Sequence, residues 1–237
     1  VVPPDSILQR MVDRYDESIM YLDHEIGRLM DALRTRGLLD NTVVIVSSDH
    51  GESWGENDLM YHGHSLYYDQ LHIPLIVRYP DAFPAGLREA TPVTLTDLPA
   101  TLAEIIPLTE DFPGSSFRPA ELASTDPEPV IAEAARRSQA AGSWPTSRGW
   151  LASLLTPDWQ YIQHRVDDAE LFAIPVDRET PVAVEIEPRL APLVRGFEQT
   201  LSRQLPAGSL LPAPMPWTEW FASSPGAVPP SWALARR

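Results

Sequence analysis

Hydrophobic residues at the start of the chain recur with the spacing of an amphipathic helix. Between Ile7 and Arg36 they stand three or four positions apart, charged residues fill the positions between them, and Gly37 offers a stop. The helix runs directly toward a β-branched segment, as the helices of βαβ units do. We therefore expect its apolar face to pack in a core, and a coiled-coil partner is the alternative. The apolar positions are Leu8, Met11, Val12, Tyr15, Ile19, Leu22, Ile26, Leu29, Met30 and Leu33.

Two short apolar segments enclose a polar stretch in the next part of the chain. Residues 42–47 form a β-branched run that suits a strand buried on both faces of a parallel sheet, and residues 73–77 form a second such run. Asp49 and His50 follow the first run, and ligands of open α/β sheets bind beyond the carboxyl ends of the strands. The pattern predicts an α/β fold with a mostly parallel sheet flanked by helices, and a site that begins at Asp49.

The polar stretch concentrates side chains that can bind a metal or move a proton. Asp49 offers a hard anionic oxygen and His50 a neutral imidazole nitrogen, and Gly51 lets the backbone turn away without a Cβ. An aspartate that caps a helix beside a surface histidine is the simpler interpretation of these three residues alone. The stretch holds four of the six histidines of the chain, namely His50, His62, His64 and His72.

The second half of the chain predicts a smaller antiparallel sheet. Residues 150–155 and 159–165 alternate between apolar and polar positions on either side of a turn, which is typical of two paired strands. A strand is also expected at 129–134, and helices at 95–106 and 188–205. A small antiparallel sheet should therefore follow the larger α/β core.

Composition divides the chain into three predicted parts. Residues 1–135 carry the α/β core, residues 136–205 form a small α+β subdomain, and residues 206–237 are a tail rich in Pro and Trp. No apolar run approaches the roughly 18 residues that span a bilayer, so we expect a soluble chain without a targeting or membrane segment.

The charge of the chain limits its partners. The net charge of −15 argues against nucleic acid and against an anionic membrane surface. An anionic substrate remains compatible with this charge if a divalent cation is bound, because the ion reverses the sign of the local field. The sequence contains no cysteine, so thiolate metal sites are excluded. It also contains no lysine, so every basic side chain other than histidine is arginine.

Four short segments occur in an order that resembles one enzyme family. They are Ser48-Asp49-His50-Gly51-Glu52, Gly55-Glu56, His62-Gly63-His64-Ser65-Leu66-Tyr67 and His72-Ile73-Pro74-Leu75-Ile76-Val77. This set resembles the sulfatase branch of the alkaline phosphatase superfamily, and it implies the C-terminal portion of an alkaline-phosphatase-like catalytic domain.

The resemblance also implies roles for individual residues. Asp49 and His50 would be ligands of one divalent cation, calcium on family grounds, although the pair also suits Mg, Mn or Zn. His62 would be the catalytic residue, because it matches a basic residue, lysine in many relatives, that contacts a sulfate oxygen. His64 is a second candidate for substrate binding, and a loop histidine that fixes Tyr67 or Asp69 is its alternative.

By this resemblance the parent protein would hydrolyse a small-molecule or saccharide sulfate ester. The formylglycine nucleophile and further metal ligands would come from an N-terminal half, which we expect this chain to lack because it starts at Val1. The chain alone is then expected to be inactive. Hydrolysis of phosphoesters or phosphonate monoesters is one alternative, and a non-catalytic assembly or binding module is the other.

Overall fold

A computed structural model describes residues 2–106, 112–122, 128–137, 142–165, 167–175 and 181–205. Its α-helices are α1 (Asp5–Thr35), α2 (Tyr68–Leu71), α3 (Asp97–Ile105), α4 (Pro119–Leu122), α5 (Pro145–Arg148) and α6 (Ala191–Gln204), with single 3-10 turns at Leu39–Asn41, Glu56–Asp58 and Pro188–Leu190. Its strands are β1 (Val44–Ser47), β2 (Ser53–Trp54), β3 (Met60–Tyr61), β4 (Leu75–Arg78), β5 (Val130–Ala134), β6 (Leu151–Leu155), β7 (Trp159–His164), β8 (Glu170–Ala173) and β9 (Val182–Val184).

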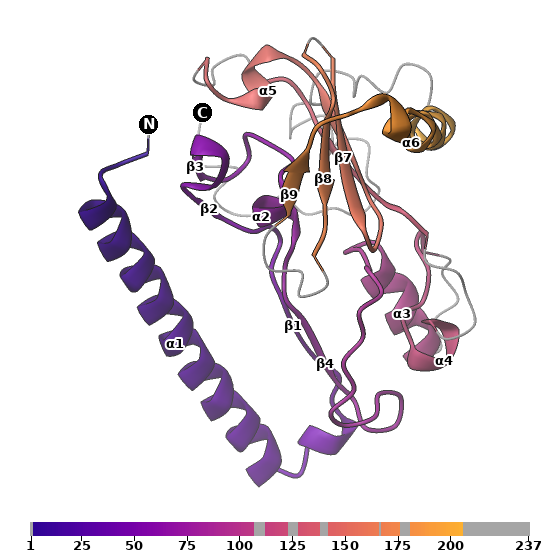
Figure 1. The fold of residues 1–237 in the computed structure, drawn as a ribbon. Helices are drawn as coiled ribbons and strands as arrows, with labels where there is room; N and C mark the ends of the chain where they lie inside the picture. Colours follow the sequence, from indigo (N-terminus) through magenta and orange to yellow (C-terminus); the bar gives the residue numbers. More distant parts are fainter. Residues whose placement is uncertain are drawn as a thin grey trace, which may run out of the picture.

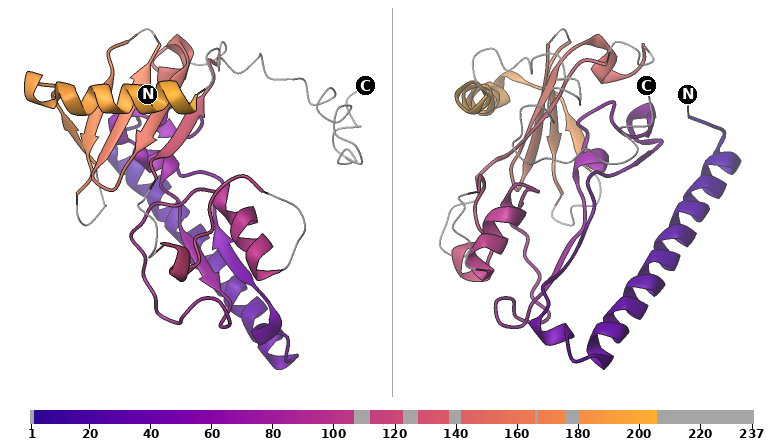
Figure 2. Two further views of the ribbon diagram at one scale, coloured as in Figure 1. Left: turned by 90° about the vertical axis from the view of Figure 1, so that its right-hand side faces the viewer. Right: turned by 180° about the vertical axis from the view of Figure 1, so that it is seen from behind.

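The long helix α1 stands along one side of the molecule (Figures 1 and 2). None of its residues is buried, and Met20 and Leu29 are 72% and 57% exposed. The helix itself was predicted correctly, but its expected packing in a core is not found among the described residues. It touches the rest of the chain through Tyr15, whose ring lies 5.3 Å from that of Trp54, and at its C-terminal end next to Leu39–Asn41. Its apolar face is therefore only partly covered in the part of the chain that the structure describes.

Strands β1 and β4 form a two-stranded antiparallel ribbon, which corrects the expected parallel pairing. The chain leaves β1 at Ser47 and returns to Leu75 at the same end, so β4 has to run backward, whereas a parallel partner needs a crossover to the opposite end. The Ser47 hydroxyl donates to the Pro74 carbonyl at 2.9 Å and closes that end of the ribbon. The expected burial on both faces is also wrong here, because Ile76 is 63% exposed.

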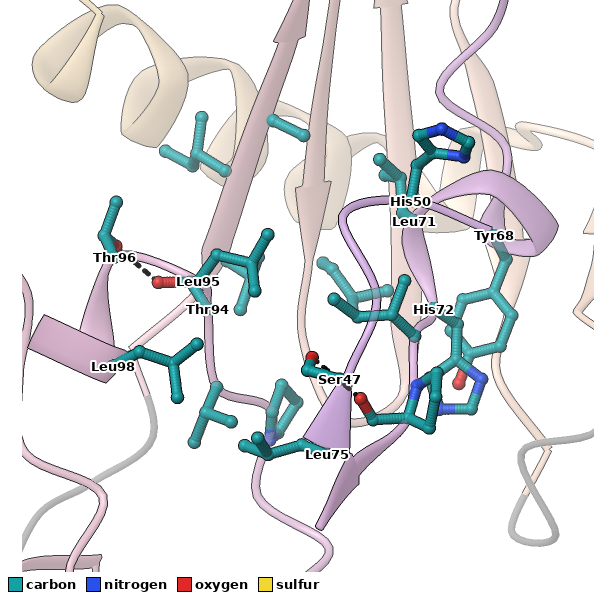
Figure 3. Close-up of a pocket in the computed structure, with 18 of the residues that line it drawn as sticks. Ser47, His50, Tyr68, Leu71, His72, Leu75, Thr94, Leu95, Thr96 and Leu98 are labelled. Atoms are coloured by element: carbon teal, nitrogen blue, oxygen red, sulfur yellow. Dashed lines mark hydrogen bonds between the residues drawn. The ribbon is translucent and has the colours of Figure 1, made fainter. Parts of the chain in front are cut away.

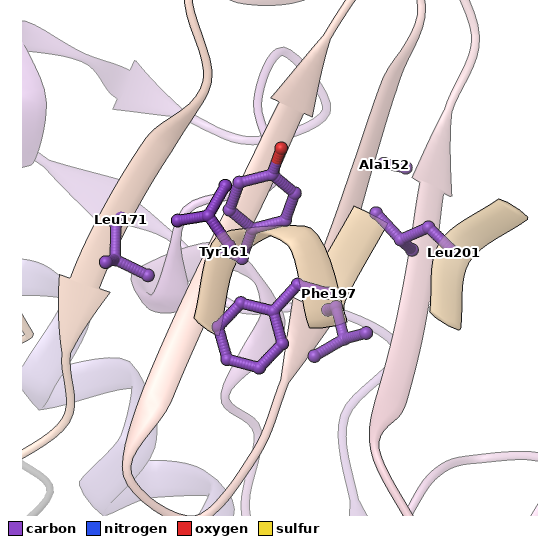
Figure 4. Packing of buried hydrophobic residues seen from close by; sticks show 7 residues of the cluster. Ala152, Tyr161, Leu171, Phe197 and Leu201 are labelled. Carbon is purple, nitrogen blue, oxygen red and sulfur yellow. The ribbon is translucent and has the colours of Figure 1, made fainter. Parts of the chain in front are cut away.

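The C-terminal sheet has the strand order β5-β6-β7-β8-β9, and all its pairs are antiparallel. The predicted pairing of 150–155 with 159–165 is confirmed. Helix α6 lies across one face and supplies Val194, Phe197 and Leu201 to the main core (Figure 4). The sheet side of this core is Ala152, Leu154, Tyr161 and Leu171. Strand β5 (Val130–Ala134) belongs to this sheet, although it lies before residue 136, where the predicted subdomain begins. The domain boundary itself stays a prediction.

The polar stretch between β1 and β4 lies against the C-terminal sheet. The Gln160 side chain on β7 donates to the Leu66 carbonyl at 2.8 Å, and the Tyr67 hydroxyl donates to Glu170 on β8 at 3.1 Å. Among the described helices, none combines the length and the hydrophobicity that crossing a membrane requires. The predicted tail 206–237 lies outside the described residues.

The core between α6 and the sheet leads to a first prediction. Replacing Leu201 by Ala should lower the free energy of unfolding by about 2–5 kcal/mol, because Leu201 is 2% exposed and its removal leaves a cavity. Urea denaturation followed by tryptophan fluorescence measures this change.

The matched control is Leu29→Ala on α1, where the same atoms are removed from a side chain that is 57% exposed. Its effect should stay within about 0.5 kcal/mol. Equal losses for the two variants would contradict the assignment of the core.

Candidate active site

The turn after β1 brings its backbone against helix α2. The Gly51 N–H donates to the Gln70 carbonyl at 2.9 Å. A Cβ on Gly51 would lie 2.0 Å from the Asp69 carbonyl oxygen, which is far inside van der Waals contact. The sequence predicted that this position needs a residue without a Cβ, and the neighbour that imposes the requirement is the backbone of Asp69. The position of Asp49 and His50 therefore depends on this close approach.

The side chains of Asp49 and His50 lie together on the open side of the turn. Asp49 Oδ1 accepts from the His50 backbone N–H at 3.1 Å and lies 3.7 Å from His50 Nε2. The His50 Nδ1 lies 2.8 Å from the Gly51 carbonyl, which accepts only, so this nitrogen carries the proton and Nε2 keeps its lone pair. The Asp49 side chain is 85% exposed. A carboxylate oxygen and an imidazole nitrogen are thus available side by side.

The imidazole of His62 stacks on that of His50. The two ring centroids are 3.8 Å apart and the ring planes differ by 29°. His62 Nδ1 lies 3.1 Å and 3.2 Å from the two carboxylate oxygens of Glu52. Three predicted site residues therefore come together, although thirteen positions separate the first from the last.

His64 lies apart from this group and is fully buried. Its Nε2 is 2.6 Å from the Met60 carbonyl and donates to it, while its Nδ1 accepts from Gln70 Nε2 at 3.1 Å. Both ring nitrogens are therefore occupied within the protein. This geometry favours the alternative in which His64 fixes the loop, and its substrate contact stays a prediction.

Gln70 is the centre of a buried polar network. Its Nε2 also donates to Ser53 Oγ at 2.7 Å, its Oε1 accepts from the Gly63 N–H at 3.1 Å, and Ser53 in turn donates to the Asp69 carboxylate. Burial raises the pKa of the Asp69 carboxyl above its usual range, and the bond from Ser53 opposes this shift. The network joins β2, α2 and the loop that carries His62.

A second set of contacts fixes the loop from the side of the C-terminal sheet. The Gly63 carbonyl accepts from Arg137 Nη1 at 2.9 Å, and the His64 carbonyl accepts from the Thr146 N–H at 3.0 Å. Gly63 has a φ of +78°, and a Cβ there would lie 2.9 Å from the Arg137 guanidinium. Sequence reasoning missed Gln70 and Arg137, and the one available signal was the left-handed conformation that Gly63 permits between two histidines.

Tyr67 extends the contact between loop and sheet. Its hydroxyl donates to Glu170 Oε1, and the other oxygen of Glu170 lies 3.0 Å from His164 Nε2. Burial, followed by the charge of Glu170, raises the pKa of the Tyr67 hydroxyl, so it stays protonated and remains a donor. The segment after His64 is therefore held to β7 and β8.

A cavity of about 620 Å³ lies beside the turn, between the ends of β1 and β4, residues 89–96 and strands β5 and β6. Asp49 and His50 are part of its lining, together with Ser47, Leu71 and Leu95. Figure 3 shows the His50 ring directed away from Thr94 and Leu95 on the opposite wall. The cavity therefore adjoins His50 without enclosing its ring.

The geometry of Asp49 and His50 fits two ligands of one cation. A cation typically lies about 2.0–2.6 Å from a carboxylate oxygen or an imidazole nitrogen. Asp49 Oδ1 and His50 Nε2 are 3.7 Å apart, so one cation can contact both atoms at such distances. The contact of His50 Nδ1 with Gly51 is the outer bond that metal-binding histidines usually make. Within the described residues no group of three or more His, Cys, Asp or Glu side chains is arranged to hold a metal ion. Calcium takes about six to eight oxygen ligands, so these two residues alone would leave such an ion under-coordinated.

Comparison with known proteins places this arrangement in a family. The family model described as Sulfatase matches residues 3–107, which include the whole turn, the stacked imidazoles and the Gln70 network. Residues 3–107 belong to the sulfatase family. It is 30% identical over 168 residues to choline-sulfatase of Rhizobium meliloti, and this alignment covers 69% of this chain and 31% of that protein. It is 37% identical over 99 residues to arylsulfatase K of Bos taurus, covering 41% of this chain and 18% of that protein. The chain thus spans less than a third of either relative.

Solved structures show the same fold. A solved structure of a protein in complex with its substrate D-glucosamine-2-N,6-O-disulfate has a TM-score of 0.71 at 22% identity, and the match covers 86% of this chain and 42% of that chain. Phosphonate monoester hydrolase of Agrobacterium radiobacter has a TM-score of 0.63 at 22% identity, and covers 77% of this chain and 38% of that chain. The predicted alkaline-phosphatase-like α/β class is confirmed, while every strand pair among the described residues is antiparallel.

The close approach at Gly51 leads to a second prediction. Gly51→Ala should cost at least about 1–3 kcal/mol of folding stability, because the new methyl forces the backbone of Asp69 and Gln70 away. It should also separate the imidazoles of His50 and His62. Thermal denaturation and the ring proton signals of both histidines in NMR spectra measure the two effects.

Gly27→Ala on α1 is the matched control, since nothing lies within 4 Å of its Cβ position. It should increase helix stability by about 0.5–1 kcal/mol and leave the ring signals of His50 and His62 unchanged. Ring signals that stay unchanged in Gly51→Ala would show that the site does not depend on this contact.

Proposed function

We propose that this chain supplies part of the active site of a metal-dependent sulfuric ester hydrolase. The observation that carries the proposal is the stacking of His62 on His50 at 3.8 Å beside the Asp49 carboxylate, in a chain of the sulfatase family. Residues distant in sequence that meet at a strand end provide a metal-binding pair and a proton-carrying group within one small area.

Asp49 and His50 are the proposed metal ligands, and calcium is the proposed ion, as the sulfatase resemblance suggests. When bound, a divalent cation neutralises charge on the ester oxygens as a Lewis acid. Asp49 contributes the anionic oxygen, and His50 contributes Nε2 because its Nδ1 proton is held by Gly51. The two side chains hold this position because the turn beneath them is fixed by the bond from Gly51 to Gln70.

His62 is the proposed catalytic residue and the proposed contact to the ester. Its side chain is 46% exposed, so a substrate can reach the ring, and its backbone lies next to the fixed Gly63. An imidazole can donate a hydrogen bond to developing negative charge or protonate a leaving group near neutral pH. Since this chain contains no lysine, a basic group that the chain itself supplies at this place is an imidazole or an arginine.

The proposed substrate is a small-molecule or saccharide sulfate ester, and the proposed partner is the remainder of a sulfatase domain. Two observations support the partner. The chain spans less than half of the matched structures, and no residue on the apolar face of α1 is buried among the described residues. The formylglycine nucleophile and the missing cation ligands would come from that remainder, which agrees with a chain that is inactive alone.

Removing the His62 ring tests the catalytic role. In a protein that contains this chain and the remainder of its domain, His62→Ala should lower kcat for an aryl sulfate by about 10²- to 10⁴-fold, the usual contribution of a positioned acid or base. His24→Ala on the exposed face of α1 removes a ring remote from the turn and should leave kcat unchanged. Unaltered turnover in His62→Ala would remove this residue from the mechanism, and faster cleavage of a phosphonate monoester by the unmodified protein would favour the phosphonate hydrolase alternative.

Calorimetric titration with calcium tests the ligand role in the same longer protein. Asp49→Asn should weaken calcium binding by at least about 10-fold, because even an outer partner of a ligand contributes that much. Asp58→Asn in the nearby loop serves as the control and should bind calcium as the unmodified protein does. Equal affinity in both variants would show that Asp49 is not a ligand, and no binding in any of the proteins would favour a non-catalytic module.

A further inference from the structure

Glu52 is an acidic residue of the turn that neither the metal pair nor the substrate contact uses. Its carboxylate oxygens lie 3.1 Å and 3.2 Å from His62 Nδ1, and its side chain is 19% exposed. The Glu52 side chain is therefore better shielded from water than the His62 side chain, which is 46% exposed. Glu52 follows Gly51 directly, so the bond between Gly51 and Gln70 also fixes the base of its side chain.

The His62 ring is held from two directions besides Glu52. One face stacks on His50, at a centroid separation of 3.8 Å. The backbone next to the ring is fixed at Gly63, whose N–H donates to Gln70 and whose carbonyl accepts from Arg137. Stacking fixes the plane of the ring but not which of its nitrogens lies on which side, and Glu52 is the group that contacts Nδ1.

The chemistry of a carboxylate decides which nitrogen carries the proton. An ionised carboxylate can only accept hydrogen bonds, and a neutral imidazole has one N–H and one lone pair. A lone pair on Nδ1 would face both oxygens of Glu52 without a proton between them. Nδ1 therefore carries the proton, and Nε2 at the opposite side of the ring is left for another group.

We propose that Glu52 is a positioning residue, which fixes His62 in the Nδ1–H form and presents Nε2 to the ester. The inference about the ester rests on the proposed function, whereas the assignment of the proton depends only on the contact of Glu52 with His62. Glu52 touches neither substrate nor cation in this scheme and acts through His62. Such orienting carboxylates commonly contribute about 10- to 100-fold to activity.

The proton assignment can be tested in the 237-residue chain alone. Nitrogen-15 NMR spectra that correlate ring nitrogens with ring protons distinguish the two neutral forms of an imidazole. At a pH where His62 is neutral, the unmodified chain should show the Nδ1–H form, and Glu52→Ala should lose it in favour of Nε2–H. An Nε2–H form in the unmodified chain would overturn the inference, whether or not the variant folds.

Glu56→Gln is the control, because Glu56 lies in the same loop but accepts from the Trp54 backbone N–H. It should leave the His62 proton on Nδ1. A loss of the Nδ1–H form in both variants would mean that general disturbance of the loop, and no specific contact, determines the proton.

The catalytic consequence is tested in the longer protein with an aryl sulfate. Glu52→Gln should lower kcat by about 10- to 100-fold while KM changes little, because the group positioned acts on the reacting atoms. Glu52→Asp, which keeps the carboxylate, should recover part of the loss. Unchanged kcat in Glu52→Gln would overturn the positioning role, and absence of sulfatase activity in the unmodified protein would instead count against the proposed function, with the NMR result unaffected.

Discussion

The close approach of the Gly51 backbone to the backbone of Asp69 and Gln70 is the constraint on which the rest of the site depends. It brings the turn after β1 within hydrogen-bond distance of α2, at a separation that no side chain larger than hydrogen permits. Asp49 and His50 precede this contact and Glu52 follows it. Its geometry therefore sets the directions in which all three side chains leave the turn. A glycine here is required by sterics, and no unusual backbone conformation is involved.

Gln70 extends this constraint from the turn to the loop that carries His62. A side-chain amide has one acceptor oxygen and two N–H donors, and here Gly63 donates to the oxygen while Ser53 and His64 accept from the nitrogen. Each bond is made in a site shielded from water, where an unpaired polar group costs about 1–3 kcal/mol. A network of this kind holds one arrangement of the loop, since any displacement leaves several groups unpaired at once. These bonds hold Gly63, the neighbour of His62, whose ring stacks on His50.

Sequence patterns predicted the elements well and their relations in space poorly. The spacing of apolar residues predicted α1, α3, α6 and the strands β5, β6 and β7 of the C-terminal sheet, because each pattern depends only on neighbours in the chain. It did not predict β9. The direction of β4 was predicted wrongly, since an apolar run is the same for parallel and antiparallel partners. The family motif predicted that Asp49, His50 and His62 would matter. Glu52 is part of the motif but received no role, and the motif gave no signal for Gln70 or Arg137. The importance of all three residues arises from contacts with residues that are not their neighbours in sequence.

The side chains that hold the loop of the candidate site are buried, whereas the side chains available to a cation or an ester are exposed. Ser53, His64 and Gln70 are buried, and Tyr67 and Leu66 are bonded to the C-terminal sheet, so the underside of the site is complete within this chain. The upper side is open, because the Asp49 side chain is 85% exposed and the His50 and His62 rings are 42% and 46% exposed. An exposed carboxylate and imidazole exchange ligands with water freely, and they gain selectivity for a cation or an ester only when further groups exclude that water. Under the proposed function, this chain would supply the base of the site, and the groups that close the upper side would approach over the stacked imidazoles.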